Sequence, residues 1–274
     1  MTTLLVVGVG LIGASIALGC RERGLFDGIV GIDSEVGPLD LPLTGLSRTV
    51  RADDRGAVEA ALSSCDLVVL ATPVLAIEDW LARALDHAPA VTDCGSTKRH
   101  IVESARGHAR FRRFVPGHPM AGGQGGRNAA DPELFGGRHW ILCDDESDAD
   151  ARARVEALVR GLGAELVRMS AAEHDAAVAM TSHAPKLLAS ALVVLSVRAN
   201  AVRAAGPGYA NAARVAGGTE GVWRDILTTN ADEVAGALRA LLAELEPIAQ
   251  DLERHPPVVG RALELLSAAR RCLK

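Results

Sequence analysis

The fold is decided by the stretch LLVVGVGLIGASIALGCRERGLFDGIVGID, residues 4–33. Its first four residues form an aliphatic run that ends in a glycine, which is typical of a buried parallel strand. Apolar residues then recur at helical spacing from Leu11 to about Arg23. A second aliphatic run, Ile29–Ile32, ends at Asp33. The stretch therefore predicts a strand–helix–strand unit.

The loop between the first strand and the helix, GVGLIG at residues 8–13, fits the pattern GxGxxG. The pattern alone is weak. Here it follows a strand, opens a helix and precedes an acid, Asp33, that lies twenty residues after Gly13. This context is that of a Rossmann-type dinucleotide-binding fold. The alternative is a glycine-rich turn in an ordinary α/β protein.

The glycines and the start of the helix predict how a dinucleotide binds. Gly8 permits the tight turn, Gly10 lets the pyrophosphate approach the backbone, and Gly13 lets helix and strand pack closely. The backbone N–H groups at the helix start would bind the phosphates. The residues predicted to contact the cofactor are Gly8, Gly10, Leu11, Ile12, Gly13, Asp33, Thr72 and Pro73, the last two of which end a later strand.

Asp33 favours NAD over NADP as the cofactor. Its carboxylate would accept hydrogen bonds from the hydroxyls of the adenosine ribose, and it would repel a 2′-phosphate. The next residues in the chain are Ser34 and Glu35, with no arginine. The predicted cofactor is therefore NAD.

Length and composition narrow the class of protein. The 274 residues carry a formal net charge of −5, and the scattered charges argue against a nucleic-acid partner. The five cysteines contain no CxxC pair, which fits reduced thiols in a cytoplasmic protein better than disulfides or a metal site. No apolar run reaches the roughly 18 residues that a membrane span needs.

Strand and helix patterns alternate as far as Ser170, which predicts a parallel sheet covered on both faces. From Ala171 onward nearly every segment has a helical pattern, with breaks at glycine and proline pairs. The predicted fold is α/β, with a Rossmann-type domain at 1–170 and an all-helical domain at 171–274.

Three polar segments mark a candidate active site. Residues 93–98, DCGSTK, follow a predicted strand, and ligands bind at the carboxyl ends of parallel strands. Residues 117–122, GHPMAG, place His118 in a loop, where functional residues are concentrated. Residues 181–186, TSHAPK, precede an apolar helix. Taken singly, the second segment also fits a histidine that caps a turn, and the third fits a simple helix break.

Together these segments make the chain resemble the prephenate dehydrogenase family. The matching segments follow the order of the family: GVGLIGAS at 8–15, TDCGSTK at 92–98, GHPMAG at 117–122, SHAPK at 182–186, ARVAG around Arg214 and VWRDI at 222–226. The resemblance implies a nucleotide-binding domain followed by a helical domain that forms a homodimer. It also implies oxidative decarboxylation of prephenate to 4-hydroxyphenylpyruvate with NAD+, in tyrosine biosynthesis.

The resemblance assigns roles to three residues. His118 matches the catalytic histidine, which takes the proton of the ring hydroxyl as hydride leaves the same carbon. Ser96 matches the serine that hydrogen-bonds both this hydroxyl and His118. Arg214 matches the arginine that binds a substrate carboxylate, a contact that suits a planar guanidinium. From its local sequence alone, Arg214 would be a surface arginine.

Four more residues are expected at the substrate: Ser182, His183, Gln124 and Lys186. Lys186 stands where some members of the family have a second histidine after the proline, and it would assist a carboxylate or be solvated. Gln124 stands where several members carry an acid that would suit the amino group of arogenate. A neutral glutamine removes that partner and favours prephenate.

Other functions remain open at this point. An enzyme acting on arogenate or on an amino-substituted prephenate is the nearest alternative. Reductases of the β-hydroxyacid or imine type share the two-domain plan, but they would not need Ser96, His118 and Arg214 together. An NAD-binding regulatory protein without turnover would not need them either.

Overall fold

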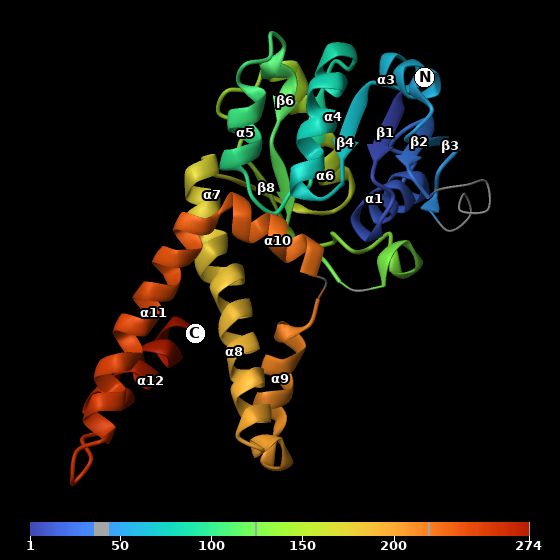
Figure 1. Cartoon of the computed structure of the whole chain (residues 1–274). Coiled ribbons are helices and arrows are strands. Elements are labelled where there is room, and N and C mark those ends of the chain that lie inside the picture. The colour runs from blue at the N-terminus through green and yellow to red at the C-terminus, as the bar shows by residue number, and fades with distance from the viewer. Residues whose placement is uncertain (36–43, 124, 219, 274) are drawn as a thin grey trace. The chain divides into compact units, whose positions relative to one another are not determined.

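The computed structural model of the chain describes residues 1–35, 44–123, 125–218 and 220–273 (Figure 1). Contacts within it divide the chain into two compact units. The first comprises residues 1–178 and 217–230, and the second comprises residues 179–216 and the chain from 231 onward. This division differs from the predicted one chiefly because the later segment 217–230 belongs with the first unit.

The first unit is built on a six-stranded parallel sheet with the strand order β3-β2-β1-β4-β5-β6. This is the strand order of a Rossmann fold, so the predicted fold class is confirmed. The strands are β1 (Thr3–Val7), β2 (Gly28–Asp33), β3 (Arg48–Arg51), β4 (Leu67–Leu70), β5 (Val91–Asp93) and β6 (Phe114–Val115).

Helices cover both faces of this sheet, because side chains alternate along each strand and both sets are apolar. Leu4 and Val6 of β1 belong to one buried cluster, whereas Leu5 and Val7 belong to the other. The first cluster includes residues of α1 (Leu11–Glu22) and α6 (Ala149–Gly161), and the second includes residues of α3 (Arg55–Ser63), α4 (Val74–His87) and α5 (Arg99–Ala105).

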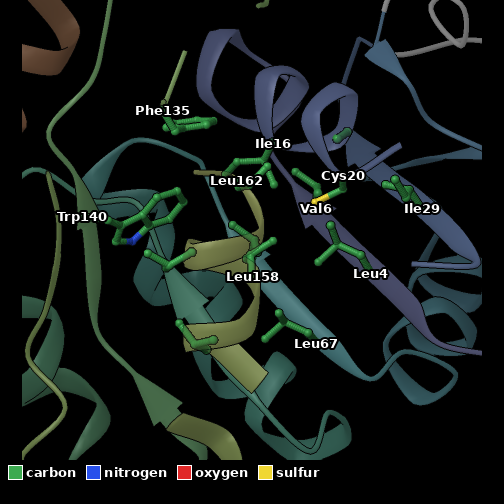
Figure 2. Close-up of a cluster of buried hydrophobic side chains, with 14 of the residues drawn as sticks. Leu4, Val6, Ile16, Cys20, Ile29, Leu67, Phe135, Trp140, Leu158 and Leu162 are labelled. Carbon is green, nitrogen blue, oxygen red and sulfur yellow. The ribbon is translucent and has the colours of Figure 1, made fainter. Parts of the chain in front are cut away.

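Two aromatic rings extend the first cluster in a chain that has few aromatic residues. Phe135 and Trp140 are fully buried, and their ring centroids lie 5.2 Å apart. Figure 2 shows them beside Leu158 and Leu162, which come from the region of α6. Aliphatic side chains of α1 and the sheet fill the rest of this cluster.

A second, three-stranded sheet in the same unit consists of β7 (Gly117–Pro119), β8 (His139–Leu142) and β9 (Glu165–Arg168). β7 pairs antiparallel with β8, whereas β8 and β9 are parallel. The prediction that His118 lies in a loop is wrong, since its backbone pairs with Ile141 of β8. Two helices complete the unit: α7 (Ala171–Val178) and α10 (Glu220–Thr229).

The described residues of the second unit form helices joined by turns and contain no strand, as predicted. A π-helical turn (Ala179–His183) leads into α8 (Ala184–Arg198), and a 3-10 turn (Ala201–Ala204) precedes α9 (Pro207–Ala216). The remaining helices are α11 (Ala231–Leu252) and α12 (Gly260–Cys272). Within this unit α8 packs against α9 and α11.

Truncation of Leu158 should destabilise the first unit. The residue is 1% exposed in the first cluster, so Leu158→Ala removes buried apolar contacts and leaves a cavity. We expect a loss of about 2–5 kcal/mol in the free energy of unfolding, measured with urea. Arg160→Ala on the same helix, where the side chain is 65% exposed, should cost less than about 1 kcal/mol. Equal losses for the two variants would contradict this packing.

Candidate active site

The loop after β1 has the geometry of a phosphate-binding turn. Gly8 has a φ of +89°, in the left-handed region where only glycine is unstrained. A Cβ at Gly13 would lie 2.0 Å from the carbonyl oxygen of Gly8, so no larger residue fits there. A Cβ at Gly10 would meet nothing within 4 Å. The space beside Gly10 is therefore open to a pyrophosphate.

A cavity of about 440 Å³ lies next to this loop. Its lining includes five of the predicted cofactor residues: Gly8, Gly10, Asp33, Thr72 and Pro73. The hydroxyl Oγ1 of Thr72 is buried, and no partner for it exists among the residues that the structure describes. A buried polar atom of this kind is normally hydrogen-bonded, so a ligand in the cavity would supply the hydrogen-bond partner of this hydroxyl. The open loop and this hydroxyl fit a dinucleotide.

The other two predicted cofactor residues, Leu11 and Ile12, are the first residues of α1. The first hydrogen bond of the helix runs from the N–H of Ala14 to the carbonyl of Gly10. The N–H groups of Leu11 and Ile12 precede it and have no partner within the helix, which suits them to bind phosphate.

Asp33 ends β2 and lies at the edge of the same cavity. Its Oδ2 accepts a hydrogen bond from the N–H of Val9 at 2.7 Å, and its Oδ1 accepts one from the N–H of Glu35 at 3.0 Å. The sequence neighbours of Asp33 include no arginine, but the fold brings one from a distant segment. Nη2 of Arg127 lies 3.8 Å from Oδ1 of Asp33.

His118 belongs to a chain of hydrogen bonds that ends on a buried carboxylate. Its Nδ1 lies 2.8 Å from Nε2 of His174, and Nδ1 of His174 lies 2.7 Å from Oδ1 of Asp175. His174 and Asp175 are completely buried. Asp175 also accepts hydrogen bonds from the backbone N–H groups of Lys98 and Arg99, at 2.7 and 2.9 Å.

The protonation states of Asp175 and His174 determine which nitrogen of each histidine carries a proton. Burial lowers the pKa of His174 and outweighs the opposite effect of its hydrogen bond to Asp175. Burial would raise the pKa of Asp175, but hydrogen bonds from His174 and from two backbone N–H groups outweigh it, and this pKa is lowered. Asp175 is therefore a carboxylate, which only accepts, and His174 is neutral. His174 donates from Nδ1 and accepts at Nε2, so Nδ1 of His118 donates to His174. In the neutral form of His118 the lone pair then lies on Nε2.

The backbone next to His118 is held by a buried ion pair between Asp93 and Lys98, both of which are 0% exposed. Oδ1 of Asp93 accepts from the N–H of Gly117 at 3.0 Å, and Nζ of Lys98 donates to the carbonyl of Gly117 at 2.7 Å. Both backbone groups of the residue before His118 are thereby fixed. Oδ2 of Asp93 also accepts from the N–H of Gly95 at 2.8 Å.

Ser96 lies between the residues of this ion pair, in the segment that joins β5 to α5. It is half-buried, and β5 contacts β7, the strand of His118. The Asp93–Lys98 pair therefore holds both segments that carry the predicted catalytic residues.

The predicted residues of the second unit lie on two of its helical segments. Arg214 is exposed on α9 and lines an apolar cavity of about 470 Å³. Lys186 of α8 is 8% exposed, and its Nζ donates to the carbonyl of Ala216 at the end of α9. The expectation of a solvated lysine is therefore wrong, because the ammonium satisfies a helix-terminal carbonyl beside Arg214.

Two more predicted substrate residues lie in the π-helical turn. Ser182 is half-buried and His183 is buried, and Pro185 follows in the first turn of α8. Single π-helical turns are frequent at functional sites. Gln124 lies outside the described residues.

The structure adds residues that sequence reasoning missed: His174, Asp175 and Arg127, together with the roles of Asp93 and Lys98. The segment 93–98 was marked as a polar segment at a strand end, which was the available signal for the ion pair. His174 and Asp175 gave no such signal, because a His-Asp pair in a helical pattern has many ordinary uses.

Comparison with known proteins identifies the family. A model of the prephenate dehydrogenase nucleotide-binding domain matches residues 16–168, and a model of the prephenate dehydrogenase dimerization domain matches residues 170–256. The chain belongs to the prephenate dehydrogenase family. The predicted nucleotide-binding domain, helical dimerisation domain and oxidoreductase class are confirmed by this membership.

Relatives in the prephenate dehydrogenase family cover most of this chain. The prephenate dehydrogenase of Bacillus subtilis (strain 168) is 32% identical over 265 residues, which are 92% of this chain and 71% of that protein. The structure of prephenate dehydrogenase from A. aeolicus in complex with hydroxyphenyl propionate and NAD+ matches with a TM-score of 0.88 and 25% identity, covering 100% and 99% of the two chains. That of Synechocystis arogenate dehydrogenase matches with a TM-score of 0.81 and 25% identity, covering 100% of both.

Breaking the Asp93–Lys98 pair should be strongly destabilising. Lys98→Met leaves a buried carboxylate without its counter-ion and should lower the free energy of unfolding by about 3–5 kcal/mol. The double variant Asp93→Asn/Lys98→Met removes both charges, so it should lose less than the sum of the two single variants. Urea unfolding of all four proteins measures this coupling, and additive losses would show that the pair is not an energetic unit.

Stability should fall as the pH drops below about 6.5, the ordinary pKa of histidine. Because the pKa of His174 is lower in the folded protein than in the unfolded chain, the unfolded chain binds this proton first as the pH falls. The stabilisation is therefore complete above that pH and is lost progressively below it. Urea unfolding at about pH 7.5 and about pH 5.5 measures the change. His174→Asn, which does not titrate, should show a smaller change, and an equal one would contradict the assignment.

Proposed function

We propose that this chain catalyses the NAD-dependent oxidative decarboxylation of prephenate to 4-hydroxyphenylpyruvate. The observation that carries the proposal is the hydrogen-bond chain from Asp175 through His174, which leaves His118 with a lone pair on Nε2. The dinucleotide cavity lies in the same unit of the protein. The neighbour from A. aeolicus binds NAD+ and hydroxyphenyl propionate, a ligand that resembles the product.

His118 is the base in this reaction. When bound, NAD+ supplies the acceptor for the hydride that leaves the ring carbon bearing the hydroxyl group. Nε2 of His118 accepts the proton of that hydroxyl, and the carbon becomes a carbonyl carbon. The positive charge on His118 is stabilised because its Nδ1–H donates to His174, which in turn donates to the Asp175 carboxylate.

Loss of carbon dioxide completes the reaction without a metal ion. The bond from the ring to the carboxylate breaks, its electron pair makes the ring aromatic, and the carbonyl oxygen becomes a phenolate. His118 then returns its proton to this oxygen. The base is restored, so no net proton is taken up or released.

The remaining predicted residues have binding roles in this proposal. The hydroxyl of Ser96 hydrogen-bonds the ring hydroxyl, and the guanidinium of Arg214 binds a carboxylate of prephenate. Lys186 is a positioning residue, because it holds the end of the helix that carries Arg214. Ser182 and His183 contribute polar groups from the π-helical turn.

Arogenate is the alternative substrate. The Synechocystis arogenate dehydrogenase has the same fold as this chain, so the fold does not discriminate between the two substrates. A neutral residue at Gln124 favours prephenate, because it offers no counter-ion to the amino group of arogenate.

We propose that the chain is a homodimer formed through its second unit. Large apolar side chains are exposed on its helices, among them Leu195 at 60%, Leu242 at 62% and Leu266 at 67%. Monomeric proteins rarely expose so many apolar side chains on neighbouring helices. The match to the family's dimerization domain supports the same conclusion.

The helical stretch Ala171–Arg198 is long and apolar enough to cross a membrane by length and composition. Buried polar side chains occur along it, including His174, Asp175 and Lys186, and they are hydrogen-bonded within the protein. A dimer interface accounts for its exposed apolar residues, and we place the enzyme in the cytoplasm. The free cysteines agree with that location: Cys20, Cys65, Cys94, Cys143 and Cys272.

Purified protein should produce NADH from NAD+ and prephenate, as followed by absorbance. His118→Asn keeps a similar shape but accepts no proton, so it should lower kcat by about 10²–10⁴-fold. Its affinity for NADH, measured by fluorescence, should be unchanged. Absence of NADH with both prephenate and arogenate would contradict the proposed function, and turnover of arogenate alone would favour the alternative.

A further inference from the structure

Arg127 lies beside Asp33, which lines the cofactor cavity, and comes from a segment that contains no recognised motif. It lies in a 3-10 turn, Gly126–Ala129, that packs against α1 in the first unit (Figure 1). Gly125 and Gly126 have φ values of +105° and +59°, a conformation that glycine adopts without strain. The two glycines therefore turn the chain so that Arg127 approaches the end of β2.

The guanidinium of Arg127 is held beside Asp33. Its Nη1 donates to the carbonyl of Glu35 at 3.1 Å, and its Nη2 lies 3.8 Å from Oδ1 of Asp33. The side chains of Arg127 and Asp33 are each 18% exposed. Both are thus partly withdrawn from water, where charge–charge interactions are less screened than at an open surface.

Asp33 occupies the position that contacts the adenosine ribose in Rossmann folds. Its Oδ2 accepts from the N–H of Val9, whereas its Oδ1 accepts from the N–H of Glu35 and lies 3.8 Å from Nη2 of Arg127. A carboxylate alone would repel a 2′-phosphate. A carboxylate beside a guanidinium presents almost no net charge there, so repulsion alone does not explain selectivity for NAD.

We propose that Arg127 and Asp33 together determine the dinucleotide specificity of this chain. The carboxylate of Asp33 interacts with the guanidinium and would accept hydrogen bonds from the ribose hydroxyls of NAD. A 2′-phosphate has to compete with Asp33 for the same guanidinium, which matches phosphate geometry well. Arg127 could therefore bind a 2′-phosphate, but its interaction with Asp33 opposes that binding. The inference rests on the proposed use of a nicotinamide dinucleotide.

The test measures the affinities of NADH and NADPH by fluorescence titration, with no substrate present. The proteins are the wild type, Asp33→Asn, Arg127→Gln and the double variant. Asp33→Asn removes a carboxylate that interacts with the guanidinium and should raise the affinity for NADPH about tenfold or more. The double variant should lose most of this gain. The gain should also shrink as salt is added, because it comes from charge attraction.

Arg160→Gln is the matched control, because it removes the same charge from an exposed position on α6. Combined with Asp33→Asn, it should leave the gain for NADPH intact. Equal NADPH affinities of Asp33→Asn and the double variant with Arg127→Gln would overturn the inference. Equal losses of NADH and NADPH affinity in Arg127→Gln would also overturn it. They would show that Arg127 contacts a part of the cofactor that NADH and NADPH share. If the wild type failed to bind NADH, the proposed function itself would fail.

Discussion

The buried ion pair between Asp93 and Lys98 is the interaction on which the active site depends. Neither side chain is exposed, so each charge is stable only because the other neutralises it and backbone groups complete its hydrogen bonds. Both partners hold the backbone of Gly117, the residue that precedes His118. The position of the proposed base is therefore fixed by a pair of charges at the end of β5.

Lys98 also connects this pair to the hydrogen-bond chain of the base. Its ammonium holds Gly117, while its backbone N–H donates to Asp175. Lys98 thus fixes the backbone next to His118. It also holds the Asp175 carboxylate, which determines through His174 that Nδ1 of His118 carries a proton. Segment 217–230 supports the same region, because the side-chain amide of Asn230 donates to the carbonyl of Asp175 at 2.9 Å. This contact is one reason why the segment belongs to the first unit.

Sequence patterns predicted features that local chemistry controls. The strand–helix–strand unit follows from the spacing of glycines and aliphatic residues, and the observed α1 and β2 lie close to the predicted bounds. The short strand of His118 was missed because its three residues contain a glycine and a proline, which signal a loop. His118, Ser96 and Arg214 were assigned by family resemblance, since single residues of these types have many uses.

Those sequence patterns could not predict contacts between residues far apart in the chain. His174 contacts His118 across 56 positions of the chain, and Arg127 approaches Asp33 only because the fold brings a distant turn to the end of β2. Asp33 illustrates the difference: its role at the ribose was predicted from its place after a strand, whereas its counter-ion was not. Lys186 was expected to assist a carboxylate or to be solvated, because nothing in the sequence shows that the end of α9 lies beside it.

The most direct measurement of the proton arrangement is the nitrogen-15 NMR spectrum of the histidine rings in the full-length protein at neutral pH. His118 and His174 should both carry their proton on Nδ1, with an unprotonated Nε2, and replacement of Asp175 by asparagine should change the tautomer population of both rings. A proton on Nε2 of His118 in the unliganded enzyme would contradict the central claim, because the nitrogen proposed to receive the substrate proton would already be occupied.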